Sequence, residues 1–166
     1  MVYNIIENRL GVQPIASIET TARHALGTIV RAEDPTYGMG EFIYLNGVAS
    51  TVVGNLVIYN PVLGTTTLSP NTSVQARPVA VAMAACTLSY YGWYQIDGAA
   101  IIKKEAVIFA PTVVVYQSTT TGRIRALAAS GKQVLGARSA NTASVVSATS
   151  TVVVLINRPH MQGAVT

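Results

Sequence analysis

The sequence predicts an all-β domain, a small barrel or jelly-roll-like sandwich with an extended N-terminal arm, and three observations support this fold class. Apolar bursts are short, turn residues separate them about every 8 to 12 residues, and several bursts alternate apolar with polar side chains. This spacing is typical of antiparallel sandwiches and barrels. The predicted divisions are an arm over residues 1–31, a β domain over 32–157 and a C-terminal tail over 158–166.

The arm differs from the rest of the chain in its charges and in its lack of a firm apolar period. Its charged residues are Glu7, Arg9, Glu19, Arg23 and Arg31. One helical turn capped by Ser17 is an alternative over residues 17–26, but mostly extended chain is predicted. Because this pattern forms no core of its own, we expect the arm to contact another molecule.

The β pattern begins at Gly40 and continues to the end of the domain. Asn46–Gly47 and Asp97–Gly98 are strong hairpin signals. The run 78–85 is continuously apolar, which indicates a strand buried on both faces. The predicted strands cover residues 41–45, 51–59, 65–68, 78–85, 89–96, 99–102, 106–109, 112–116, 123–127, 132–138, 143–146 and 151–157.

The middle of the chain is almost free of charge, since Arg77 and Asp97 are its only charged residues from Phe42 to Ile102. Charged residues make up 11% of the whole chain, against about 25% in ordinary soluble domains. Neutral outer faces suit a protein that packs against other subunits. The net charge of +4 is dispersed, so direct nucleic-acid binding is not predicted. No apolar run reaches the ~18 residues of a membrane span, so no membrane partner is predicted either.

The sequence offers no residue set for catalysis, for a metal or for a cofactor, and none is predicted. Cys86 lies in an apolar run and is interpreted as a small buried hydrophobe. His24 and His160 lie near opposite ends of the chain, without ligand spacing or a nearby nucleophile. No paired carboxylates for acid–base chemistry are visible. A hydrolase is therefore disfavoured for want of a nucleophile–base pair.

The aromatic cluster around Trp93 is the most distinctive local feature. On a strand, Tyr91 and Trp93 share one face, while Tyr90 and Tyr94 share the other. Three interpretations stay open: aromatic core packing, a subunit interface, or a sugar-stacking surface formed by Tyr90 and Tyr94.

Several segments together resemble bacteriophage capsid decoration (cement) proteins. They are residues 23–32 (RHALGTIVRA), 40–50 (GEFIYLNGVAS), 91–98 (YGWYQIDG) and 113–116 (VVVY), with the turn at Thr121 and Gly122. The resemblance implies a β-rich virion protein that is made in the bacterial cytoplasm and binds the outer surface of the expanded capsid. It also implies a homotrimer that resists internal DNA pressure. The long N-terminal stretch departs from the compact members of that family.

On this basis we expect the partners to be the major capsid protein and further copies of the chain, as a homotrimer or a dimer. The candidate capsid or subunit contacts are Arg23, His24, Arg31, Tyr90, Tyr94, Arg123 and Arg125. The alternative function is a carbohydrate-binding or host-contact module on the phage surface.

Overall fold

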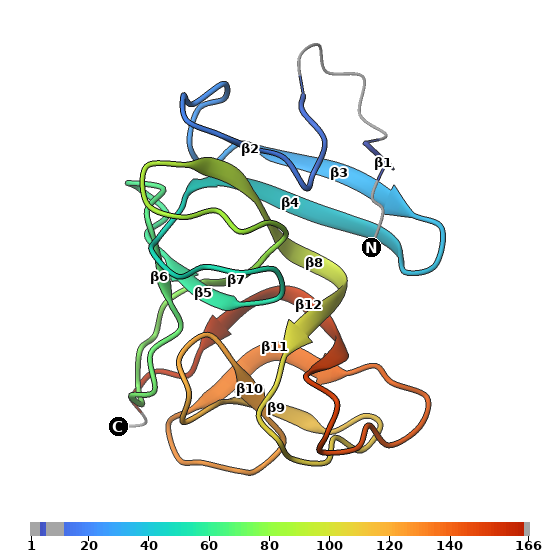
Figure 1. The fold of residues 1–166 in the computed structure, drawn as a ribbon. Coiled ribbons are helices and arrows are strands. Elements are labelled where there is room, and N and C mark those ends of the chain that lie inside the picture. The colour runs from blue at the N-terminus through green and yellow to red at the C-terminus, as the bar shows by residue number, and fades with distance from the viewer. Residues whose placement is uncertain (1–3, 6–11, 165–166) are drawn as a thin grey trace.

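The described residues of the computed structural model, 4–5 and 12–164, contain β-strands and no helix. Strands account for 46% of the residues, and they form a curled antiparallel sheet that resembles half of a barrel (Figure 1). The all-β prediction is confirmed. The helical turn considered near Ser17 is absent, since that segment contains a short strand instead.

The sheet has twelve strands among the described residues. Most predicted strands are present with shifted ends, but residues 106–109 and 143–146 contribute only an isolated bridge between Phe109 and Val145. The strands are β1 (Asn4–Ile5), β2 (Ile18–Glu19), β3 (Ile29–Asp34), β4 (Gly38–Asn46), β5 (Leu56–Tyr59), β6 (Thr66–Leu68), β7 (Val79–Ala82), β8 (Tyr91–Lys103), β9 (Val114–Gln117), β10 (Ile124–Arg125), β11 (Gln133–Ser139) and β12 (Thr151–Met161).

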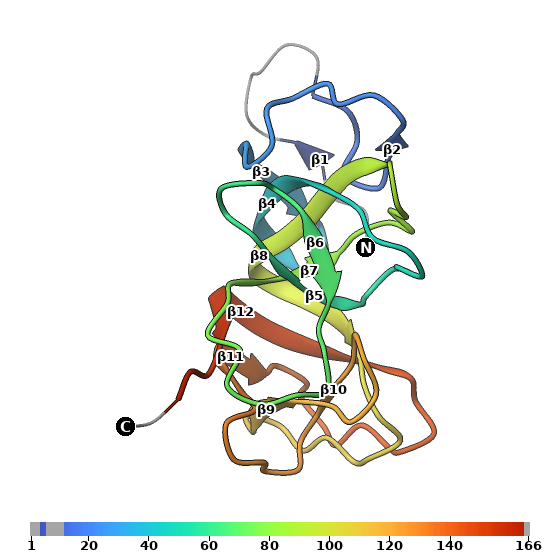
Figure 2. The same ribbon diagram turned by 90° about the vertical axis from the view of Figure 1, so that its left-hand side faces the viewer.

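Strand β8 organises the sheet, because the main strand order is β1-β3-β4-β8-β12-β11-β9-β10. One edge of β8 pairs with β4 between Tyr91 and Gly98. Its remaining pairs are with β2, β7 and β12 in succession along the strand. Strands β5, β6 and β7 form a branch at mid-height, between β3–β4 above and β9–β11 below (Figure 2).

Alternation along the strands divides the buried side chains among three clusters. Phe42 and Tyr44 on β4 pack with Trp93, whereas Ile43 and Leu45 pack with Tyr94. The branch is buried on both faces, with Leu56, Ile58, Val79 and Val81 in the lower cluster and Val57, Ala80 and Ala82 in the middle one. A strand buried on both faces reads as a continuous apolar run, so the prediction of such a strand near residues 78–85 is confirmed.

Both predicted hairpins are wrong. Strand β4 pairs with β3 and β8 rather than with the strand that follows Gly47. A Cβ at Gly47 would lie 2.2 Å from the carbonyl oxygen of Cys86, so glycine is needed there for a close backbone approach. Strand β8 continues through Gly98, which has a φ of +93° and would place a Cβ 2.3 Å from the Met39 oxygen. Next to it, the β4–β8 register shifts between Glu41 and Phe42.

The described part of the N-terminal segment lies against the β domain. Ile15 and Val30 are buried in the cluster around Trp93, and β2 pairs with β8. Strand β3 continues across the boundary expected after Arg31, and β12 continues across the one expected after Asn157. Residues 1–3 and 6–11 of the arm and 165–166 of the tail lie outside the described residues.

We predict that Gly98→Ala destabilises the domain more than Gly27→Ala does. Gly27 has a similar φ of +87° but nothing within 4 Å of an added Cβ, so its substitution should cost about 1 kcal/mol through backbone strain alone. At Gly98 the same strain is joined by the clash with Met39, and the cost should reach about 3 kcal/mol. Urea denaturation of the two variants checks this, and equal losses would contradict it.

Candidate interaction surfaces

The predicted contact residues fall in separate regions of the fold. Arg23 and Tyr90 line one hollow near the start of β8, together with Ile18, Glu19, Thr20 and Thr21. Arg31 lies on β3, and Arg125 lies on β10 with Arg123 just before it. Strands β3 and β10 lie near opposite ends of the sheet order, so these arginines do not form one basic patch.

The hollow near the start of β8 has a volume of about 440 Å³ and contains an ion pair. Arg23 Nε lies 2.6 Å from Glu19 Oε2, and the arginine side chain is 65% exposed against 17% for the glutamate. Arg23 therefore already has an acidic partner within its own chain.

His24 anchors the N-terminal segment on the aromatic cluster. Its ring centroid lies 5.2 Å from that of Tyr44 and 5.5 Å from that of Trp93. His24 Nε2 lies 2.7 Å from Gln13 Oε1, within hydrogen-bond distance. These contacts give His24 a packing role within the chain.

Tyr94 is fully buried, which corrects the expectation of a surface contact at this residue. It packs in the cluster that also contains Cys86, and burial raises the pKa of both side chains. Tyr90 is half-buried, so Tyr90 and Tyr94 do not form an exposed stacking platform. Of the three interpretations of the cluster, core packing holds for Trp93 and Tyr94. The prediction that Cys86 is a buried hydrophobe is also confirmed.

A row of charged residues crosses four strands where the sheet bends, and sequence reasoning missed it. The register sets Arg31 on β3 opposite Glu41 on β4, and Glu41 opposite Asp97 on β8. Arg158 on β12 reaches the same glutamate, with Nη2 2.7 Å from Glu41 Oε2, while Arg31 Nε lies 3.1 Å from Oε1. The carboxylate pair was invisible in sequence because only the strand register brings the two acids together.

The two carboxylates of this row differ in their pKa values. The hydrogen bond from Arg158 is the largest influence on Glu41 and, with help from Arg31, lowers its pKa despite partial burial. Burial and then the charge of Glu41 raise the pKa of Asp97. The hollow beside them measures about 220 Å³, below the range of typical ligand pockets. We interpret the row as a structural contact in which Glu41 joins β4 to Arg31 on β3 and to Arg158 on β12.

A second polar network lies where β8 ends. Lys104 is 1% exposed, and its Nζ donates to the carbonyl oxygens of Val107 at 2.7 Å, Glu105 at 3.2 Å and Ser147 at 3.5 Å. Burial lowers the pKa of this amine. The lysine thus joins two loops by their backbones. A lysine flanked by charged residues gives no sequence signal for such burial.

The neighbouring Glu105 fixes the turn after β9. Its Oε1 accepts hydrogen bonds from Ser118 Oγ at 2.6 Å, from Thr119 N at 2.8 Å and from the Thr119 hydroxyl. Burial works to raise the pKa of Glu105, but these hydrogen bonds outweigh it and lower the pKa. The positive charge of Arg125 acts in the same direction, which gives this candidate contact an electrostatic role inside the chain.

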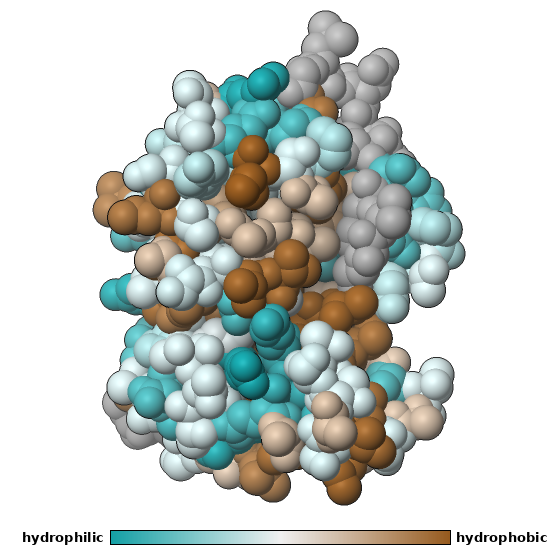
Figure 3. All heavy atoms as spheres, viewed as in Figure 1, coloured by the Kyte–Doolittle hydropathy of each residue, from teal (hydrophilic) through white to brown (hydrophobic). Residues whose placement is uncertain are grey.

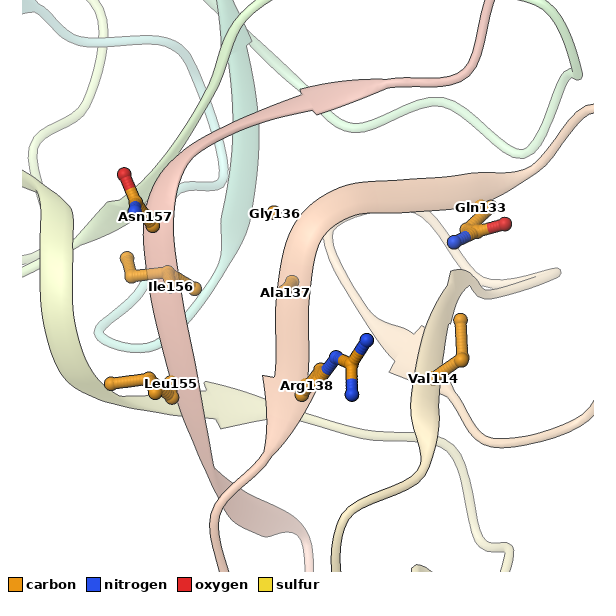
Figure 4. A pocket seen from close by; sticks show the side chains of 8 residues that line it. All are labelled: Val114, Gln133, Gly136, Ala137, Arg138, Leu155, Ile156 and Asn157. Atoms are coloured by element: carbon orange, nitrogen blue, oxygen red, sulfur yellow. The ribbon is translucent and has the colours of Figure 1, made fainter.

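A further hollow of about 340 Å³ results from an irregularity in the sheet (Figure 4). It lies beside the bulge in β11, where the register against β12 shifts between Leu135 and Ala137. Gly136 sits in the bulge with a φ of +76°. Apolar and polar residues both line this hollow, and Arg138 is the one charged residue among them.

Large apolar side chains are exposed at many places on the surface. Figure 3 shows them as several brown patches on one face, beside polar regions. The exposed set comprises Ile18, Leu26, Met39, Val52, Val53, Val62, Leu63, Val74, Leu88, Ile108, Leu127, Val146 and Leu155.

The described residues contain no cluster of three or more histidine, cysteine or acidic side chains that would hold a metal ion. They also contain no helix that is long and apolar enough to cross a membrane. No protein-family model, curated protein or solved structure matches the chain.

We predict that Glu41→Gln lowers the stability by about 1 kcal/mol or less near pH 7, because both partner arginines are well exposed. A carboxylate with a depressed pKa stabilises the fold above its ordinary value of 4.5, and this contribution is lost as the pH falls through the depressed pKa. The difference from wild type should therefore shrink at an acid pH well below 4.5. Denaturant titrations at both pH values test this, and a constant difference would refute the assignment.

We also predict that Lys104→Met costs about 1–3 kcal/mol, since the buried ammonium that donates to Val107 O and Ser147 O would be lost, whereas Glu105 O keeps the donor Val107 N. Hydrogen exchange should accelerate in the segments around Val107 and Ser147. Lys103→Met is the matched control, because this half-buried neighbour should change stability by less than about 0.5 kcal/mol. Similar losses in the two variants would show that the Lys104 ammonium is not what joins the loops.

Proposed function

We propose that the chain is a non-enzymatic virion structural protein that binds the outer surface of a tailed-phage capsid and stabilises it against internal DNA pressure. The observation that carries the proposal is the exposed apolar surface on a chain with few charges. A solitary soluble domain rarely exposes large apolar patches, so such surface favours a protein that binds other subunits. The resemblance of four segments to capsid decoration proteins narrows the assembly to a capsid.

The turn between β5 and β6 is the best-formed candidate for the docking element. Val62 and Leu63 at its tip are 88% and 61% exposed. Asn60 Oδ1 accepts hydrogen bonds from their backbone N–H groups at 2.9 and 3.1 Å, which restrains the backbone at the tip of the turn. Leu26 packs against the backbone of Gly64 at the base of the turn. A rigid apolar tip loses little conformational entropy on binding.

The charged networks support the same proposal in a different way. The guanidinium groups of Arg23 and Arg31 are already paired with acids of their own chain. Arg123 and Arg125 are then the candidates for contact with acidic capsid loops. Apolar contact supplies most of the affinity for the capsid. Such contacts are individually weak, but linking several copies raises avidity by about 10²–10⁴-fold. Self-association as a homotrimer or a dimer belongs to this proposal.

We predict that Val62→Asp/Leu63→Asp weakens binding to expanded capsids by about tenfold or more. Both side chains are exposed, so the variant should keep the wild-type melting temperature. The measurement is cosedimentation with capsids prepared without the chain. The same capsids should release DNA at lower temperature and recover when wild-type protein is added, because binding stabilises the bound state.

Val146→Asp is the matched control, because Val146 is also exposed, at 60%, but lies in the loop between β11 and β12. Unchanged binding of the double variant would remove the β5–β6 turn from the docking surface. Failure of the wild-type protein to bind capsids would refute the proposed function itself.

A further inference from the structure

An uncharged groove lies between the turn that joins β3 to β4 and the loop that joins β11 to β12. Both segments lie on the right of Figure 1, and the groove has a volume of about 680 Å³. Thr36 and Tyr37 line it from the turn, and Asn141 lines it from the loop. Ala99 on β8 and Val153 on β12 contribute small apolar side chains. The volume is within the range of small-molecule sites.

Hydrogen bonds hold the turn in place. Asp34 is buried, and its Oδ1 accepts from the backbone N–H groups of Thr36 at 2.8 Å and Tyr37 at 3.0 Å. The pairing of Asp34 with Gly38 closes the turn. Tyr37 is half-buried, and the hydrogen bond from its backbone N–H to Asp34 restrains its position in the turn.

Hydrogen bonds to the segment around Phe109 and to β12 hold the loop. Asn141 Nδ2 donates to the carbonyl oxygens of Phe109 at 3.1 Å and Ala143 at 2.6 Å. Val145 exchanges two backbone hydrogen bonds with Phe109, and Ala140 N donates to Val153 O at 2.9 Å. A ligand that enters between two fixed segments has little ordering to impose on the protein.

The chemistry of the lining selects the class of ligand. None of the lining residues is charged near neutral pH, so an ionic ligand would lose its hydration without gaining a counter-charge. Thr36, Thr142 and Ser144 line the groove together with Tyr37 and the apolar residues, so hydroxyl-bearing and apolar side chains share its lining. A purely apolar ligand would leave these polar groups unpaired.

We propose that this groove binds a neutral saccharide. A sugar ring combines C–H patches that pack on apolar and aromatic side chains with hydroxyls that both donate and accept hydrogen bonds, which suits a lining of tyrosine, alanine, valine, threonine and serine. The hollow beside Tyr90 is a poorer fit for a neutral ligand because the Glu19–Arg23 ion pair lines it. The inference does not depend on capsid binding.

The test is saturation-transfer NMR on the full chain with maltotriose and N-acetylated chitotriose as neutral probes and sialyllactose as an acidic comparator. We expect a neutral probe to bind with a Kd of about 1 mM and sialyllactose to bind more weakly. Tyr37→Ala should weaken binding about fivefold or more, and Ser144→Trp should block it by filling the groove.

Two matched controls should bind the probe as wild type does. Tyr90→Ala removes a half-buried tyrosine outside the groove, and Ser147→Trp places the same bulk at an exposed serine further along the loop. Absence of binding by both neutral probes up to about 10 mM would overturn the proposal. Loss of binding in Tyr90→Ala but not in Tyr37→Ala would also overturn it.

Discussion

The continuity of β8 through Gly98 is the constraint on which the rest of the structure depends. The first half of this strand pairs with β4, and its second half pairs with β12. Between them the backbone approaches Met39 so closely that a side chain at Gly98 has no room. One strand therefore belongs to both ends of the curled sheet, and the three buried clusters form around it. A break at this point would separate the aromatic cluster from the lower core.

The distribution of charge follows from the same arrangement. A chain with few charged residues uses many of them on its own contacts. Glu41 holds two arginines from β3 and β12, Lys104 joins two loops, and Glu105 fixes the turn after β9. The outer surface then carries apolar groups such as Val62 and Leu63, which are available to a partner. This division between internal ionic contacts and external apolar ones is the physical basis of the proposed assembly role.

Sequence reasoning succeeded where the information is local and failed where it depends on register. The short alternating strands predicted the all-β class, and the unbroken apolar run near Val81 predicted a strand buried on both faces. The hairpin predictions at Gly47 and Gly98 were wrong because glycine is needed there for a close approach of two backbones, not for a tight turn. The partnership of Glu41 with Arg158 joins residues 117 positions apart, and the burial of Tyr94 depends on the branch of strands that covers it. Neither leaves a local pattern.

The shared strand also determines how the domain would respond to mechanical load. If the two ends of the sheet are pulled apart, the tension runs along β8 and reaches seven residue pairs with β4 and seven with β12. Hydrogen bonds in an antiparallel pair lie across the strand direction. A pull along the strand therefore loads them together in shear, whereas a pull at a hairpin end would open them one at a time. A domain built in this way yields abruptly and at high force, rather than by gradual unzipping.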